Sequence, residues 1–141
     1  MSYSILIVDD SLPMRAVIKR TFKAAGYGNS QFLEAANGKE ALELMKNDWI
    51  DIVLTDYNMP VMNGLEFIKT YKSMDVLKDI PVVVVSTEGN EAKIKEFMDS
   101  GADGYITKPF TPEEIRDLAT NILGEISYDE DLEDSDDDFD F

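Results

Sequence analysis

The sequence predicts an α/β fold built on a parallel sheet, and two observations support this prediction. Short apolar runs typical of strands alternate with segments whose apolar residues recur at helical spacing. The run from Ile80 to Val85 has no polar alternation, which is typical of a strand covered by helices on both faces. Five strand and helix units can be counted in the 141 residues, enough for one domain and a tail.

The first two units contain residues that start and stop helices. Ser11 is a candidate N-cap and Pro13 lies in the first turn of the first helix, which ends before Gly26. Asn37 opens the second helix, which continues through Lys46. The strands that precede these helices are predicted at residues 5–8 and 31–35.

The last three units follow the same pattern. Proline and an Asn-Gly pair between residues 57 and 64 predict a loop, and helical spacing resumes over 65–73. A helix over 91–100 stops at Gly101. The segment from Thr111 to Glu114 is a capping box with proline at the first helical position, and its helix runs to Leu123. The three strands are predicted at residues 51–55, 80–85 and 105–107.

Composition narrows the function classes. The net charge of −16 argues against nucleic acid as a direct partner, because DNA binding depends on basic residues that displace counterions. The absence of cysteine excludes disulfides and Cys-ligated zinc, and the absence of histidine means that a phosphohistidine donor must be another protein. Apolar stretches are far shorter than the roughly 20 residues of a membrane span. With no room for a signal peptide before Ile5, we expect a soluble, cytoplasmic protein.

Four of the apolar runs end in chemically reactive groups. Asp9 and Asp10 follow the first strand, Asp56 follows the third, Ser86 the fourth and Lys108 the fifth. Because the carboxyl ends of parallel strands share one edge of the sheet, three carboxylates, a hydroxyl and an ammonium group would meet there. Such a set is suited to holding a divalent cation and a phosphoryl group.

Each of these residues also has an ordinary structural explanation when it is considered alone. The acids can cap a helix or lie solvated in a loop, the lysine can be exposed, and the serine can bond nearby backbone. Together they are more informative, because crowded carboxylates raise one another's pKa unless a cation lies between them. Magnesium fits best, since it prefers carboxylate, carbonyl, water and phosphate oxygens. Asp56 is then a candidate nucleophile on phosphorus, with Lys108 offsetting charge on the transferred oxygens and Ser86 donating a hydrogen bond to one of them.

An ordered set of short motifs resembles the response-regulator receiver domain, most closely the single-domain chemotaxis type. The resemblance covers about Ser4 to Leu123, and as an ordered set it is highly specific. The matching segments are Val8 to Ser11, Leu54 to Pro60, Asn63-Gly64, Val85 to Glu88, Gly101-Ala102 and Gly104 to Phe110.

The resemblance implies a flavodoxin-like, doubly wound sheet of five parallel strands in the order 2-1-3-4-5, with five helices. It implies that Asp56 accepts a phosphoryl group, and that the peptide bond before Pro109 is cis. It also implies a magnesium ion held by Asp9, Asp10, Asp56 and the backbone carbonyl of Asn58.

The resemblance further implies a switch. Ser86 is expected to be drawn toward the phosphoryl group, and Tyr105 to turn inward, so that the surface of the fourth helix, fifth strand and last helix changes its partners. Asn58 and Glu88 lie where the family tunes hydrolysis of the acyl phosphate. Thr87 stands where many relatives carry alanine, and its bulk is expected to bias the Tyr105 rotamer. Without the family pattern, Tyr105 is more simply a half-buried strand aromatic.

These features favour a phosphorylation-activated response regulator of a two-component, chemotaxis-like system, a signalling protein rather than an enzyme. The expected partners are a histidine kinase and a downstream effector or motor protein, and the chain is expected to be a monomer or a weak phosphorylation-dependent dimer. The alternative is a phosphorelay intermediate that passes its phosphoryl group to a histidine phosphotransfer protein. A haloacid-dehalogenase phosphatase would need an acid where Asn58 stands, and a flavodoxin-type carrier is disfavoured because Asp9 and Asp10 would repel flavin phosphate.

The C-terminal end departs from the receiver pattern. Ten acidic residues and no basic residue lie between 125 and 141, so we divide the chain into a receiver domain over 1–124 and an acidic tail over 125–141 that is expected to be disordered. The simpler hypothesis is a solubilising appendage. The other notes Leu132, Phe139 and Phe141 among the acids, a composition suited to docking on a basic apolar groove of a partner or near the switch surface.

Overall fold

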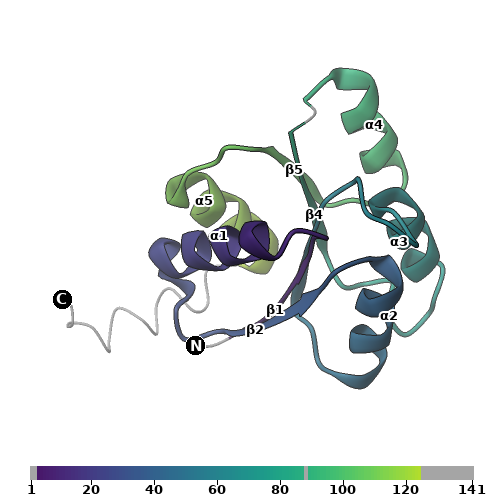
Figure 1. The fold of residues 1–141 in the computed structure, drawn as a ribbon, viewed down its shortest axis with the longest axis horizontal. Helices are drawn as coiled ribbons and strands as arrows, with labels where there is room; N and C mark the ends of the chain where they lie inside the picture. The colour runs from purple at the N-terminus through teal and green to yellow at the C-terminus, as the bar shows by residue number, and fades with distance from the viewer. Residues whose placement is uncertain (1–2, 88, 125–141) are drawn as a thin grey trace.

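The computed structural model describes residues 3–87 and 89–124, which form a parallel sheet between two layers of helices (Figure 1). The hydrogen-bonded strand order is β2-β1-β3-β4-β5, and every pair is parallel, as the resemblance implies. The strands are β1 (Ser4–Val8), β2 (Gln31–Ala35), β3 (Ile52–Thr55), β4 (Val82–Ser86) and β5 (Gly104–Thr107). The helices are α1 (Leu12–Phe22), the π-helical turn η1 (Lys23–Tyr27), α2 (Gly38–Asn47), α3 (Gly64–Lys72), α4 (Glu91–Asp99) and α5 (Pro112–Leu123).

The sheet is buried on both faces, which explains why its strands lack polar alternation. Figure 1 shows α1 and α5 on one side of the sheet and α2, α3 and α4 on the other. Along β1, Leu6 and Val8 join the core beneath α2, α3 and α4, whereas Ile5 and Ile7 join the core beneath α1 and α5. Successive side chains of a strand point to opposite faces, so two cores require apolar residues at every position.

The helix starts agree with the capping signals in the sequence. The Ser11 hydroxyl accepts a hydrogen bond from the Met14 N–H (3.2 Å), and Thr111 forms the predicted capping box with Glu114. Asn side chains cap α2, α3 and α4 in the same way, although only Asn37 had been identified as a helix start. Each cap satisfies a backbone N–H that the helix itself leaves unpaired.

The strand boundaries differ from the predictions by one or two residues. β3 begins at Ile52 rather than Asp51, whose carboxylate instead accepts a hydrogen bond from the Ser4 N–H (2.8 Å). β4 begins at Val82 rather than Ile80, because Pro81 has no N–H to give to the ladder. Ser86 is the last residue of β4 rather than the first of the loop. The acidic tail over 125–141 lies outside the described residues, as does Glu88.

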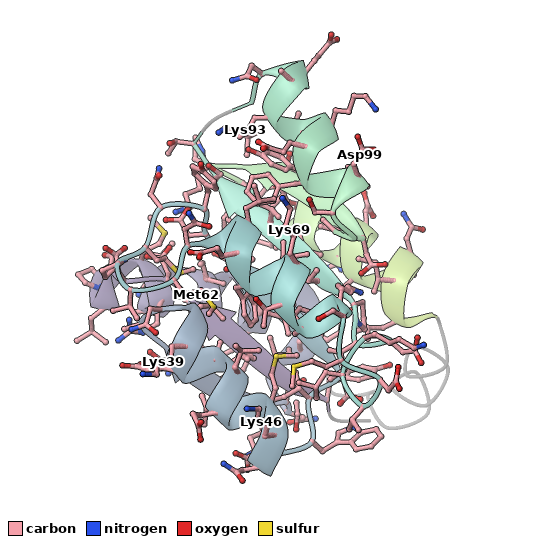
Figure 2. All side chains as sticks on the ribbon, turned by 90° about the vertical axis from the view of Figure 1, so that its right-hand side faces the viewer. Lys39, Lys46, Met62, Lys69, Lys93 and Asp99 are labelled. Carbon is pink, nitrogen blue, oxygen red and sulfur yellow. The ribbon has the colours of Figure 1, made fainter. Side chains whose placement is uncertain are left out.

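The loop between β3 and α3 packs against the start of α2 and holds the end of β3 in place. Met62 lies beside α2 (Figure 2), and its carbonyl accepts a hydrogen bond from the Gly38 N–H (3.1 Å). The Gly64 N–H donates to the Tyr57 carbonyl (2.9 Å), which closes the loop. A Cβ at Gly64 would overlap the backbone carbonyl oxygen of Asp56, so only glycine allows this approach.

The same loop contains a strained residue. Val61 has φ 68°, a left-handed conformation that a β-branched residue rarely adopts. The hydrogen bond from the Met62 N–H to the Pro60 carbonyl (2.7 Å) closes a three-residue turn around it. Strain of this kind persists only where the surrounding structure fixes the chain, and it often accompanies functional sites.

No helix in the described part of the chain is long and apolar enough to span a membrane.

We predict that Gly64→Ala lowers the free energy of unfolding by roughly 1–3 kcal/mol, because the added methyl group must displace the backbone at Asp56. Urea denaturation measures the change. Gly28→Ala is the matched control, since Gly28 has φ −65° and open space around its Cα. Equal stability of the two variants would contradict this account of the loop.

Candidate functional site

The carboxyl edge of the sheet brings together residues that are far apart in the sequence. The ladder continues one residue past three strands: the Asp9 N–H donates to Ala35 (3.0 Å) and the Asp56 N–H to Val8 (2.9 Å). The Lys108 N–H donates to the Ser86 carbonyl (2.9 Å). These backbone bonds fix the position at which each functional side chain leaves the sheet.

Three carboxylates form one cluster at this edge. Asp9, Asp10 and Asp56 each offer an oxygen, and these oxygens lie within 4.8 Å of one another. Asp9 is buried, Asp56 is partly buried and Asp10 is exposed. Like charges this close repel strongly, and an oxygen-only set of ligands suits a hard divalent cation. The cluster therefore has the composition of a site for a hard divalent cation.

Lys108 follows the edge strand β5 and reaches this cluster along the carboxyl edge of the sheet. Its Nζ is 3.3 Å from Asp9 Oδ2 and 3.9 Å from Asp56 Oδ1. The side chain is 13% exposed, so its charge is poorly screened by water. The Lys108–Pro109 peptide bond is cis, as the resemblance implies. The ammonium group thus offsets part of the negative charge of two of the three acids.

The pKa of Asp56 is raised above its ordinary value. Burial is the largest cause, because it penalises the charged form, and the charges of Asp9 and Asp10 act in the same direction. Lys108 and a hydrogen bond from the Tyr57 N–H (2.8 Å) oppose the shift without cancelling it. The ionised form of Asp56 is therefore disfavoured in this site, and an added positive charge nearby would stabilise it.

Backbone and hydroxyl groups orient the acids. Asp9 Oδ1 accepts from the Ser11 N–H (2.9 Å) in a turn before α1, whereas the cap of that helix is Ser11 itself. The Thr55 hydroxyl donates to the Asp56 carbonyl (2.9 Å). Asp9 therefore serves the turn and the cluster at once, because its two oxygens face different partners.

Sequence reasoning missed a cation behind the cluster. Arg15 donates from Nη1 to the Asp9 carbonyl (2.6 Å) and from Nε to Glu34 (2.8 Å). Hydrogen bonds from Lys19 and then Arg15 hold the pKa of Glu34 below its ordinary value. The available signal was Glu34 itself, a charged residue inside an apolar strand, which needs a partner when it is partly buried.

Of the other predicted site residues, the structure describes Ser86, Asn58 and Thr87 at or after the carboxyl ends of strands, and Tyr105 within β5. Ser86 is buried and Tyr105 is partly buried, on neighbouring strands β4 and β5. Asn58 is exposed in the loop two residues after Asp56, and Thr87 is exposed directly after β4. The structure brings the acids and Lys108 into contact distance. Strand register pairs Ser86 with Thr107 at the carboxyl edge, whereas Tyr105 pairs with Val84, two residues before that edge.

A chain of aromatic rings links the acid cluster to β5. The ring of Tyr57, the neighbour of Asp56, meets the Phe97 ring of α4 edge-on at 5.4 Å, and Phe97 meets the Tyr105 ring at 5.9 Å. Phe97 is fully buried, and Lys93 Nζ lies 4.2 Å from the Tyr57 ring centre. Edge-to-face pairs fix relative ring orientation. Tyr57, Phe97 and Tyr105 thus form a continuous ring contact between the loop after Asp56, α4 and β5.

Comparison with known proteins identifies relatives over this region. A family model for the response regulator receiver domain matches residues 5–120. The chain is 40% identical to a chemotaxis protein CheY homolog of Campylobacter jejuni over 121 residues, 85% of this chain and 92% of the relative. The solved structure of chemotaxis protein CheY4 of Vibrio cholerae shares 34% identity, with a TM-score of 0.77 over 87% of this chain and all of the other.

A further solved structure shows the same fold at 19% identity. It is the receiver domain of a sensor histidine kinase from Pseudomonas aeruginosa, with a TM-score of 0.78 over 88% of this chain and 99% of the other. That protein is described with a magnesium ion coordinated in its active-site cleft.

We predict that Asp56→Asn raises the melting temperature at pH 7 in the absence of divalent cations. A group whose pKa is raised by folding destabilises the fold once pH exceeds its ordinary value, so removing its charge is favourable there. The gain should vanish at low pH, where Asp56 is protonated in both folded and unfolded chains. Thermal melts from acid to neutral pH test this, with exposed Asp117→Asn as the control. A pH-independent gain would point to a cause other than charge.

Proposed function

Because the chain belongs to the response regulator receiver domain family, we propose that it is a phosphorylation-activated regulator that receives a phosphoryl group on Asp56. CheY-like receiver domains are signalling proteins of two-component systems rather than classical enzymes, and they work between a histidine kinase and a downstream target. The observation that supports the proposal is the cluster of three carboxylates at one edge of the sheet, two of which, Asp9 and Asp56, lie 3.3 Å and 3.9 Å from Lys108 Nζ. We place this phosphoryl transfer in the cytoplasm, where ATP phosphorylates histidine kinases.

In the proposed reaction, an oxygen of Asp56 attacks phosphorus while the bond from phosphorus to the donor imidazole nitrogen breaks. The imidazole keeps the electron pair and takes a proton, so the donor returns to neutral histidine. The Tyr57 N–H holds the carboxylate in one orientation (2.8 Å), which favours attack. Lys108, already 3.9 Å from Asp56, offsets charge on the transferred oxygens, and the Ser86 hydroxyl donates to one of them.

Receiver domains bind Mg²⁺ at a cluster of aspartates, and the residues present here fit that ion. We propose that Asp9, Asp10, Asp56 and the Asn58 carbonyl hold it, since all supply hard oxygen atoms. When bound, the ion supplies positive charge that lowers the repulsion between Asp56 and an incoming phosphoryl group. Asp10 and Asn58 are exposed, so the ligand set faces solvent and the donor.

This chain offers the donor protein an apolar surface beside the site. A hollow of about 260 Å³ lies between α1 and the segment after β5, and it is lined by Met14, Val17, Thr87, Lys108, Pro109 and Phe110. Leu12 and Val17 of α1 are exposed, at 64% and 39%. A kinase domain that delivers phosphohistidine to Asp56 must cover this rim, and these apolar groups give it area to bury.

We propose that phosphorylation is transmitted to the surface of α4, β5 and α5 through Ser86 and the aromatic chain. Movement of Ser86 toward the phosphoryl group shifts the end of β4, where Ser86 pairs with Thr107 of β5, two residues after Tyr105. Tyr105 is only partly buried, so a more buried rotamer changes the surface that it leaves. Asn58 and Glu88 tune hydrolysis in this proposal, and Thr87 biases the Tyr105 rotamer.

Phosphorylation by a small donor tests the acceptor. We predict that incubation with acetyl phosphate and Mg²⁺ adds the mass of one phosphoryl group to the full chain, and that Asp56→Asn abolishes the addition because the nucleophilic oxygen is lost. Intact-mass spectrometry measures the product. Asp51→Asn, an acid at the opposite edge of the sheet, is the control and should be modified normally. Continued modification of Asp56→Asn would place the acceptor elsewhere.

Magnesium binding is tested by thermal shift. Millimolar Mg²⁺ should raise the melting temperature of the wild type, because an ion that binds only the folded chain stabilises it by RT ln(1 + [Mg²⁺]/Kd). The Asp10→Asn variant should lose most of the increase, since it lacks one ligand of the cluster. Asp117→Asn removes the same charge from α5 and should keep it. Equal shifts for both variants would mean that Mg²⁺ does not bind at the cluster.

A further inference from the structure

A second hollow lies at the amino edge of the sheet, opposite the site of phosphorylation. Its volume is about 370 Å³, and it lies between the end of α2, the start of β3 and the segment before β4. Met45, Ile50 and Leu77 are buried and form its floor. Apolar hollows of this size are common binding sites when polar groups surround them.

Two exposed apolar side chains border this hollow. Trp49 is 79% exposed and Val76 is 90% exposed, values that are unusual for large apolar residues. The Trp49 indole is held by a hydrogen bond from Nε1 to Asp51 Oδ1 (2.9 Å), and Asp51 Oδ2 accepts from the Ser4 N–H (2.8 Å). The indole is thereby anchored to the start of β1. An exposed but ordered tryptophan loses little entropy on binding, and tryptophan is enriched among residues that dominate interfaces.

The charged side chains that line the hollow are all acidic. Asp48, Asp51 and Asp79 line it, and no lining residue is basic. Within residues 3–87 and 89–124, the carboxylates of Asp48 and Asp79 form no ion pair. Lys78 lies in the same turn, but its Nζ is directed to Asp75 (3.7 Å). An apolar floor with an acidic rim complements a segment that is apolar and basic.

We propose that this hollow is a docking surface for a basic, apolar segment of a partner protein. An arginine or lysine of the segment would lie between the Trp49 ring and the free carboxylates, where cation–π attraction and ion pairing act together. A neighbouring aliphatic side chain would enter the hollow beside Val76. The acidic stretch over 125–141 is a poor occupant because the rim repels it, and a second copy would present the same acids.

The position of the hollow gives this contact a distinct role. The residues that line it precede β3 and β4, whereas the acid cluster follows β1 and β3 at the other edge. A partner docked here leaves Asp56 and the surface of α4, β5 and α5 uncovered. The contact therefore tethers the protein whether or not it is phosphorylated, and it does not rest on the proposed function.

Trp49 is the only tryptophan, so its fluorescence reports this surface alone. The full chain is titrated at physiological salt with a synthetic amphipathic peptide of arginine and leucine, and with a glutamate and leucine peptide of equal length. We expect the basic peptide to shift Trp49 emission to the blue in a saturable way. Val76→Ser and the pair Asp48→Asn/Asp79→Asn should each weaken its affinity about tenfold.

The matched control is the pair Glu43→Gln/Glu66→Gln, which removes the same charge from exposed positions outside the hollow and should bind as the wild type does. If this control weakens the affinity for the basic peptide equally, the binding reflects the overall negative charge rather than the hollow, and the proposal is overturned. A shift caused by the acidic peptide, or one that appears with protein concentration alone, would overturn it in favour of a tail-like segment or a second copy. Addition of acetyl phosphate and Mg²⁺ should leave the affinity of the wild type unchanged, and a change that is absent in Asp56→Asn would overturn the independence from phosphorylation.

Discussion

The repulsion among Asp9, Asp10 and Asp56 is the constraint around which the rest of the structure is arranged. Their oxygens lie within 4.8 Å of one another, and burial together with the neighbouring acids raises the pKa of Asp56. Lys108 compensates only in part, at 3.3 Å from Asp9 and 3.9 Å from Asp56. A site with this much unbalanced negative charge gains most from a divalent cation, which would also offset the charge of an incoming phosphoryl group.

The parallel sheet brings the three acids together. Contacts around the loops that carry them hold their backbone in place. Buried strands with helices on both faces bring their carboxyl ends to one edge. Gly64 lets the loop after β3 close on the Asp56 backbone, and Arg15 holds the carbonyl of Asp9. From Tyr57 the contact continues through Phe97 to Tyr105, so the charged site and the outer surface of β5 belong to one packed network.

The two edges of the sheet differ in chemistry, and this separates two kinds of contact. At the carboxyl edge the acids converge on one another and on Lys108, which suits a small ion and a phosphoryl group. At the amino edge Asp48 and Asp79 surround an apolar hollow and stay apart from basic side chains of the described segments, which suits a basic apolar segment. A protein with this division can be held by one partner while it signals to another.

The sequence alone determined what depends on local chemistry. The valine run of β4, the capping box at Thr111 and the stop at Gly26 fix element types, because propensity and capping act over a few residues. Strand order came only with the family resemblance, since alternation predicts a parallel sheet but not which strands are neighbours. The contact of Lys108 with Asp9, the support from Arg15 and the hollow beside Trp49 were decided by tertiary structure. These features join side chains from different elements, and strand register and helix packing set their distances.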